Sequence, residues 1–239
     1  HRPAILDRAT EYLFYQTVVG AWPLSTARCV AFLEKAAREA KVHTSWRRQD
    51  TEYETGVRDF AAAALDDDDF LDDLEDFVAS LLEPGRVNSL ALTLLKLTVP
   101  GVPDLYQGTE LWDLSLVDPD NRRPVDFAER ARLLARLDNA TCEDVLAETA
   151  TGLPKLWVVR QALALRRSRP SSLGPDGGYR ALTVAGPRAE HAVAYLRGDE
   201  VAAVVPRLLL RLEGDWRDTA VELPAGRWRH VLTLSLIHI

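Results

Sequence analysis

Apolar residues recur at helical spacing through the first part of the chain. The clearest stretch is residues 87–98, where apolar side chains follow the i, i+3, i+4, i+7 rule of an amphipathic helix. Pro84-Gly85 is expected to end the helix before it, and Ser25 is expected to cap the start of another. The pattern predicts helices at residues 4–19, 25–41, 51–65, 70–82, 87–98, 124–137 and 153–167.

The pattern changes near residue 178 to short apolar runs separated by turn residues, which is typical of strands. A Pro-, Ser- and Gly-rich linker at residues 170–178 precedes them. The predicted strands are residues 179–185, 191–197, 200–205, 219–223 and 227–232. We therefore predict two domains: residues 1–172, a helical region with one αβ unit, and residues 173–239, a small all-β sandwich.

The αβ unit follows directly after the helix at 87–98. Pro100-Gly101 breaks that helix, residues 102–106 form a short strand-like run, and residues 107–123 are a polar loop rich in aromatic residues. A helix, a buried strand and a long loop at the strand's C-terminal end describe a parallel α/β architecture. In (β/α)8 barrels that loop position is where sites are built.

Charge and composition exclude several classes of function. The chain has 239 residues and a net charge of −7, which argues against nucleic-acid binding. No run of about 18 apolar residues predicts a membrane span. Two cysteines, Cys29 and Cys142, are interpreted as small buried thiols in a cytoplasmic protein. No cofactor is expected, and the acidic run at residues 66–69 is read as solvated and not as a metal site.

Candidate chemistry is concentrated between residues 100 and 124. Carboxylates, amides and guanidinium groups beside aromatic rings suit a sugar, whose hydroxyls need donors and acceptors and whose ring faces need stacking partners. The alternative is a simple turn carrying surface charges. Calcium is not favoured, because the EF-hand spacing and its glycine are missing. The polar and aromatic residues of this stretch are Tyr106, Gln107, Glu110, Trp112, Asp113, Asp118, Asp120, Asn121, Arg122 and Arg123.

Residues 101–110, GVPDLYQGTE, resemble the G-x-P-x-x-Y-x-G-x-E motif around the eighth barrel strand of the α-amylase family. The longer run at residues 106–127, YQGTELWDLSLVDPDNRRPVDF, resembles one branch of that family, which forms trehalose ends on malto-oligosaccharides. Residues 10–23, 41–46 and 223–233 also resemble that branch. The resemblance implies the C-terminal end of a (β/α)8 barrel with extra helices, followed by a β-sandwich.

The implied reaction is an intramolecular transglucosylation that converts the reducing-end α-1,4 bond of a malto-oligosaccharide to an α,α-1,1 bond. The family's three catalytic carboxylates lie after earlier barrel strands, and none of their motifs occurs here. We therefore assign no catalytic residue and expect the missing N-terminal part of the same enzyme as the partner of this chain. The fragment is expected to be inactive alone.

The resemblance also implies which side chains contact substrate, with no metal ligand among them. Glu110 is expected to order the loop more than to do chemistry, and Trp112 either stacks on sugar or anchors the loop. His43, with Lys41 and Trp46, is interpreted as a structural group at a helix end. The residues expected to contact substrate are Tyr106, Gln107, Glu110, Asp113, Asp118, Asn121, Arg122 and Arg123.

Two other functions remain open: a sugar-binding module without chemistry, and the end of another α-amylase-family hydrolase. The chain starts at His1 and contains no methionine, so the true start is expected upstream. The apolar segment 234–239 is read either as a last strand or as non-native sequence.

Overall fold

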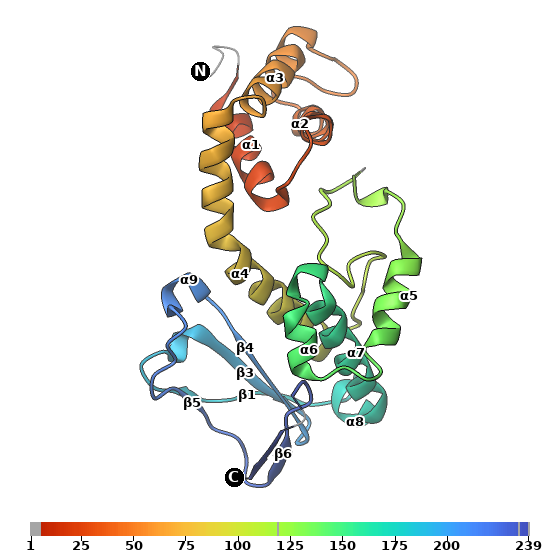
Figure 1. Cartoon of the computed structure of the whole chain (residues 1–239), viewed down its shortest axis with the longest axis vertical. Coiled ribbons are helices and arrows are strands. Elements are labelled where there is room, and N and C mark those ends of the chain that lie inside the picture. Colours follow the sequence, from red (N-terminus) through yellow and green to blue (C-terminus); the bar gives the residue numbers. More distant parts are fainter. Residues whose placement is uncertain (1–5, 119, 234, 239) are drawn as a thin grey trace. The chain divides into compact units, whose positions relative to one another are not determined.

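The computed structural model describes residues 6–118, 120–233 and 235–238 of the chain (Figure 1). Its residues form two compact units. The first unit comprises His1–Leu82 with Leu114–Pro124, and the second comprises Glu83–Asp113 with Val125–Ile239. The predicted division at residues 172/173, between a barrel part and a sandwich, is based on the change of sequence pattern and not on compactness. It stays a prediction. Each unit is described by itself.

Three helices and the first half of a fourth make up most of the first unit. The predicted cap is confirmed, since the Ser25 side chain accepts a hydrogen bond from the Arg28 N–H. Asp7 and Asp50 cap the helices that follow them in the same way. The helical elements are α1 (Arg8–Ala21), α2 (Thr26–Ala40), α3 (Thr51–Ala64), α4 (Asp68–Thr98, shared by both units) and the 3₁₀ turn η1 (Asp120–Arg122).

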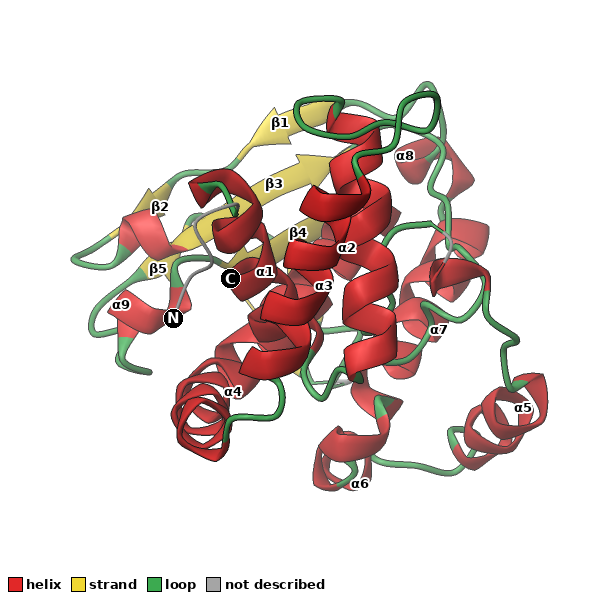
Figure 2. Ribbon diagram, turned by 90° about the horizontal axis from the view of Figure 1, so that it is seen from above, coloured by secondary structure: helices red, strands yellow, loops and turns green. Residues whose placement is uncertain are grey.

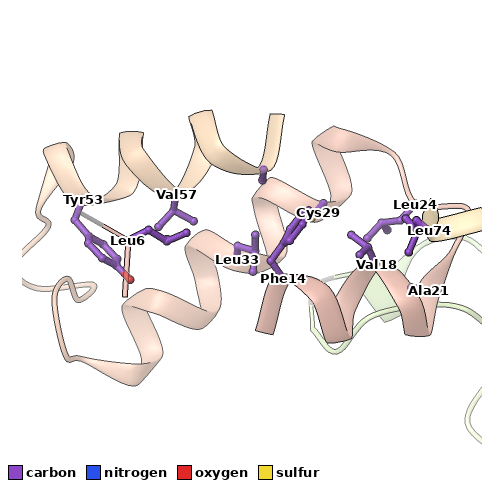
Figure 3. Close-up of a cluster of buried hydrophobic side chains, with 11 residues drawn as sticks. Leu6, Phe14, Val18, Ala21, Leu24, Cys29, Leu33, Tyr53, Val57 and Leu74 are labelled. Carbon is purple, nitrogen blue, oxygen red and sulfur yellow. The ribbon is translucent and has the colours of Figure 1, made fainter. Parts of the chain in front are cut away.

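The apolar faces of these helices form one core (Figure 3). Tyr53 lies at one end of it and Leu74 at the other, with Phe14 and Cys29 between them. The Phe14 and Phe60 rings meet edge to face with centroids 5.1 Å apart. The expected burial of Cys29 is confirmed, and burial raises the pKa of its thiol to about 11. Cys142 is only partly buried.

Helix α4 corrects the predicted break at Pro84-Gly85, because the helix runs through both residues without interruption. Pro84 has no N–H to donate within the helix, and such a position costs about 3 kcal/mol. Packing at both ends offsets this cost, since Leu74 lies in the core of the first unit and Leu97 is fully buried in the second.

The helices of the second unit include two that the periodicity predicts, α5 and α7. The predicted linker at 170–178 in fact begins with a short helix, α8, and two other short helices, α6 and α9, also lack a periodic signal. Helices α5, α6 and α7 share a core around Leu133, Val145 and Trp157. The elements are α5 (Phe127–Arg136), α6 (Cys142–Ala147), η2 (Thr149–Thr151), α7 (Leu153–Ser168), α8 (Pro170–Leu173), η3 (Ala189–His191) and α9 (Leu209–Leu212).

The strands of the second unit are antiparallel and form three separate sheets, in the orders β1-β3-β4, β2-β5 and β6-β7. Figure 2 shows β1, β3 and β4 of the largest sheet. In the largest sheet, Tyr195 stands opposite Ala181 and Ala203. All five predicted strand regions contain strands, but residues 179–185 are divided into two. The strands are β1 (Tyr179–Ala181), β2 (Val184–Ala185), β3 (Ala192–Arg197), β4 (Val201–Pro206), β5 (Ala220–Val221), β6 (Arg227–Arg229) and β7 (Leu236–His238).

Residues 102–106 are the main correction to the predicted elements, because they form no strand. A strand needs a neighbour to complete its hydrogen-bond ladder, and these residues pair with no strand in the described part of the chain. In the segment 234–239, Leu234 and Ile239 lie outside the described residues, while β7 pairs with β6. The chain thus has a mixed helix and sheet fold, and the barrel and sandwich stay predictions.

A buried arginine joins helix α4 to the β-sheet inside the second unit. The guanidinium of Arg197, on β3, donates to the Thr98 carbonyl at the end of α4 and to three carbonyls between residues 174 and 178. Arg166 of α7 donates to the neighbouring Leu97 carbonyl at 2.9 Å. Two positive side chains therefore satisfy the last carbonyls of α4, where the helix dipole favours positive charge.

Candidate functional site

The residues expected to contact substrate are divided between the two units. Four of them, Tyr106, Gln107, Glu110 and Asp113, belong to the second unit. The other four, Asp118, Asn121, Arg122 and Arg123, belong to the first unit.

In the second unit, residues 106–110 form a tight turn. The Tyr106 carbonyl accepts hydrogen bonds from the N–H and the hydroxyl of Thr109 at 3.0 and 2.7 Å. Glu110 Oε2 accepts from the Gly108 N–H at 3.0 Å and from Arg130 Nε at 3.1 Å. Arg130, on α5, also donates to the Gly108 carbonyl at 2.7 Å. The turn is therefore held by one carboxylate and one guanidinium.

Glu110 makes the contacts expected of a loop-ordering side chain, and a contact with substrate stays a prediction for it. Gly108 has φ +95°, a conformation that favours glycine. The side chains of Tyr106, which is 43% exposed, Gln107 and Asp113 reach solvent. They are the polar groups of this segment that a ligand can reach.

Trp112 anchors the loop to the start of α7. Its indole N–H donates to the Thr149 carbonyl at 2.7 Å, and the Arg86 guanidinium lies 6.0 Å from its ring centroid. A Cβ at Gly152, where φ is +83°, would lie 2.7 Å from the Trp112 backbone nitrogen. Glycine at this position therefore lets the loop lie directly against α7. The structure shows the anchoring contacts, and stacking on sugar stays a prediction.

In the first unit, Asp120 organises the segment 114–124. Its carboxylate accepts from Arg28 Nε at 2.9 Å and Nη2 at 2.8 Å, and from the Leu116 N–H at 2.8 Å. It also lies 3.1 Å from Arg123 Nε. The hydrogen bonds from Arg28 lower the pKa of Asp120 against the opposing effect of burial. Arg28 was not among the predicted site residues, because it lies 92 positions earlier and carries no motif signal.

Of the other predicted side chains of this segment, Arg122 and Arg123 reach solvent, whereas Asn121 has a buried oxygen. Arg122, 69% exposed, pairs with Asp118 at 2.5 Å, and half of Arg123 is exposed. The Asn121 side-chain oxygen is buried and accepts no hydrogen bond from the described residues. A buried oxygen without a donor is costly, so this atom is suited to accept from a ligand or from water.

The segment 41–46 rests on a buried charge pair. Arg38 donates two hydrogen bonds to Glu54, at 2.9 and 2.7 Å, and Thr44 donates a third at 2.6 Å. These bonds, from Arg38 above all, lower the pKa of Glu54 to about 2. The Arg38 guanidinium lies 4.9 Å from the ring centroid of the exposed Trp46. Lys41 ends α2 in the left-handed conformation, with φ 59°.

His43 stacks on Tyr53, with ring centroids 4.5 Å apart, and its Nε2 lies 3.4 Å from Asp7. The Tyr53 hydroxyl donates to the same Asp7 carboxylate at 2.7 Å. Burial alone would raise the pKa of Asp7, but hydrogen bonds from Tyr53 and Thr10 lower it to about 2. These contacts agree with the structural role expected for His43.

No metal or membrane site stands out in the part of the chain that the structure describes. Among these residues there is no group of three or more His, Cys, Asp or Glu side chains that could hold a metal ion. None of the described helices is both long and apolar enough to cross a membrane.

No protein-family model matches the chain. Curated relatives do match: the putative maltooligosyl trehalose synthases of two Mycobacterium tuberculosis strains, CDC 1551 / Oshkosh and H37Rv, are 41% identical over 236 residues. That match covers 95% of this chain and 29% of each relative. The chain therefore spans less than a third of their length.

Solved structures give the same result. The maltooligosyltrehalose synthase of Arthrobacter ramosus is 41% identical, with a TM-score of 0.85, over 97% of this chain and 30% of its own. A hypothetical maltooligosyl trehalose synthase of Sulfolobus tokodaii is 32% identical, with a TM-score of 0.77, over 98% of this chain and 30% of its own. The homologues are thus the trehalose-forming branch that residues 106–127 predict, and the match is to their C-terminal part.

Proposed function

We propose that this chain is the C-terminal part of a maltooligosyl trehalose synthase. The whole enzyme would convert the reducing-end α-1,4 bond of a malto-oligosaccharide to an α,α-1,1 bond, leaving a trehalose unit at that end. The observation that carries the proposal is the similarity to such enzymes along almost the whole chain, at 41% identity and a TM-score of 0.85.

The segment 102–106 supports the view that the chain is one piece of a barrel. It pairs with no described strand, and Val102 is 98% exposed. A parallel barrel strand is buried on both faces and reads as an apolar run. We infer that the rest of the enzyme supplies the neighbouring strands, and that the β-strands of the second unit continue as the sandwich.

The chemistry itself is assigned to the rest of the enzyme, because none of the motifs that carry the family's catalytic carboxylates occurs in this sequence. The acid of a glycoside-cleaving carboxylate pair must hold its proton near neutral pH, which requires a raised pKa. In the described residues, every carboxylate with a resolved shift has a lowered pKa, namely Asp7, Glu54, Asp120, Glu129 and Asp144. These groups are stabilised as anions, so none of them is suited to be the acid.

This chain would instead bind the sugar. The exposed Tyr106, Gln107 and Asp113 lie on a turn that Glu110 holds rigid, and would contact glucosyl units near the reducing end. Asp118, Asn121, Arg122 and Arg123 would contribute from the segment that Asp120 orders. Each of these two segments would help exclude water, which otherwise captures the glucosyl intermediate. We place this reaction in the cytoplasm.

The test uses the complete open reading frame that contains this chain, incubated with maltopentaose. Reducing ends should disappear while the chain length stays the same, and NMR should show an α,α-1,1 linkage. Asp113→Asn should raise KM, whereas Asp138→Asn, at an exposed residue paired with Arg160 on the surface, should not. Release of glucose or maltose would instead identify a hydrolase, and binding without turnover a sugar-binding module.

A further inference from the structure

Trp46, in the segment that joins α2 to α3, is exposed and yet held in one position. The residue is 56% exposed. Single exposed apolar residues are common on protein surfaces and need no explanation, so the fixed position of this one is the informative observation. His43 is different, because its imidazole stacks on Tyr53. The structural role expected for His43 therefore does not account for Trp46.

A buried ion pair fixes the indole ring. The Arg38 guanidinium lies over the Trp46 ring, 4.9 Å from its centroid. That guanidinium is held in turn by two hydrogen bonds to Glu54, at 2.9 and 2.7 Å, and Glu54 is only 5% exposed. Because Arg38 covers one face of the ring, the accessible area of the indole lies on its other face and its edges.

Hydrogen bonds also fix the backbone of residues 44–50. The hydroxyl of the buried Thr44 accepts from the Asp50 N–H at 3.0 Å. Between these two residues, the Ser45 N–H donates to the Arg48 carbonyl at 3.0 Å. The Arg48 N–H donates back to the Ser45 hydroxyl, also at 3.0 Å. The indole therefore stands on a rigid turn, which lowers the entropy cost of binding a ligand there.

A flat aromatic face beside hydrogen-bond donors suits a sugar. The C–H groups of a glucosyl ring pack on an aromatic face, and its hydroxyl oxygens accept hydrogen bonds. Donors are available nearby, because the exposed Arg47 and Arg48 follow Trp46 directly. An anionic ligand would need only the two guanidinium groups, so the indole favours a neutral sugar.

Helix α2 separates this turn from the segment 114–124 within the first unit. Arg28, on the first turn of α2, donates to Asp120 of that segment at 2.8 Å, whereas Lys41 ends the helix just before the turn. The helix has 15 residues and is about 22 Å long at 1.5 Å per residue. This length is far greater than one glucosyl unit, so the two places contact different units of a sugar chain.

We propose that Trp46 is a stacking surface for a glucosyl unit remote from the reducing end, and that it favours longer malto-oligosaccharides. This inference rests on the proposed function, in which the segment 114–124 contacts units near the reducing end. A short oligosaccharide that fills those contacts does not reach the indole, whereas a long one does. The additional contact acts equally on the bound substrate and on the transition state, so it lowers KM and leaves kcat unchanged.

Oxidation of tryptophan in the complete protein tests the contact directly. Limiting N-bromosuccinimide is applied alone, with saturating maltoheptaose or with maltotriose, and mass spectrometry quantifies the oxidation of each tryptophan. Maltoheptaose should protect Trp46 at least several-fold and maltotriose should not, while Trp216, 37% exposed in the second unit, should oxidise equally in all samples. Equal oxidation of Trp46 with and without maltoheptaose would show that the contact does not exist. No oxidation of Trp46 in any sample would mean that another part of the protein covers the indole, which also overturns the proposal.

Substitution measures the effect on substrate length. Trp46→Ala should raise KM for maltoheptaose about 3- to 10-fold, as loss of one aromatic contact predicts, with little change in kcat and a smaller effect on KM for maltotriose. Trp46→Phe should restore part of the affinity, because it keeps an aromatic face. The matched control is Phe77→Ala, at a residue of α4 that is 55% exposed, and it should leave both KM values unchanged.

The outcomes of these substitutions distinguish the two proposals. An unchanged KM for maltoheptaose, or an equal rise of KM for both oligosaccharides, would refute a remote contact at Trp46. Absence of trehalose formation in the wild type would refute the proposed function instead. Protection of Trp46 by maltoheptaose in that inactive protein would still demonstrate the sugar contact.

Discussion

The buried Arg197 offers the sharpest test of how the second unit is held together. Its guanidinium donates to the Thr98 carbonyl at 2.7 Å, to Gly174 at 3.0 Å, to Gly178 at 3.1 Å and to Gly177 at 3.2 Å. The side chain is fully buried and has four carbonyl acceptors in place of a carboxylate. The perturbation is Arg197→Met, which keeps most of the volume and removes every donor.

The expected loss follows from two opposing contributions. Hydrogen bonds to a charged group contribute about 1.5–3 kcal/mol each, so four of them give a gross value of about 6–12 kcal/mol. Burying the charge costs several kcal/mol, which the methionine no longer incurs. The Gly174 and Gly177 carbonyls lie in a partly exposed linker where water can replace the lost donor, whereas Thr98 is buried. We expect a net destabilisation of about 3 kcal/mol.

The assay is hydrogen exchange of peptides from β3 and β4 across a urea series. The chain has two compact units, so the probe must report unfolding of the second unit alone. With a urea slope of about 2–3 kcal/mol/M, the midpoint should fall by about 1–1.5 M. The matched control is Arg180→Met, at an exposed arginine on β1, which should stay within about 0.5 kcal/mol of the wild type. Equal midpoints for the two variants would refute the argument that Arg197 holds α4, the linker and the sheet together.

Three further changes test the candidate site and the first unit. Glu54 has its pKa lowered from 4.5 to about 2, so it stabilises the fold fully above pH 4.5 and loses this contribution as the pH falls through about 2. Glu54→Gln should lower the free energy of unfolding by about 3 kcal/mol at pH 7 and make the urea midpoint depend less on pH between pH 5 and 2. Parallel plots of midpoint against pH for the variant and the wild type would contradict this. Gly152→Ala should destabilise by about 1–3 kcal/mol through backbone strain and the contact with Trp112, while Gly20→Ala, with open space in α1, should stabilise by about 0.5–1 kcal/mol in thermal melts. Asp120→Asn should speed limited proteolysis within residues 114–124 several-fold, and an unchanged cleavage rate would show that this carboxylate does not order the segment.

Local patterns in the sequence predicted those features that depend on neighbouring residues, namely helices and a helix cap. The helices at α1, α2, α3 and α7 follow from apolar periodicity, and the cap of α2 follows from Ser25, because both signals lie within one or two turns. The break predicted at Pro84-Gly85 was wrong for the same reason. A local rule records the missing donor of a proline, but not the packing at the two ends of a 31-residue helix.

The candidate loop was located by motif, and its composition predicted that the segment is polar and suited to a sugar. Its internal order was not predictable. Asp120 is held by Arg28 across 92 positions, and Trp112 is held by the Thr149 carbonyl across 37. No periodicity links residues so far apart. From the sequence alone, other arginines of the chain are equally good partners for Asp120.

The sequence by itself determined the type of most elements, the polar character of residues 106–123 and the resemblance to trehalose-forming enzymes. Each of these depends on residue type and local spacing. Only the tertiary structure decided which groups are paired, as Arg197 among four carbonyls shows. Pairing depends on distances between elements, and hydrogen bonds and ion pairs act only over a few ångströms. Those distances arise when the helices and strands pack.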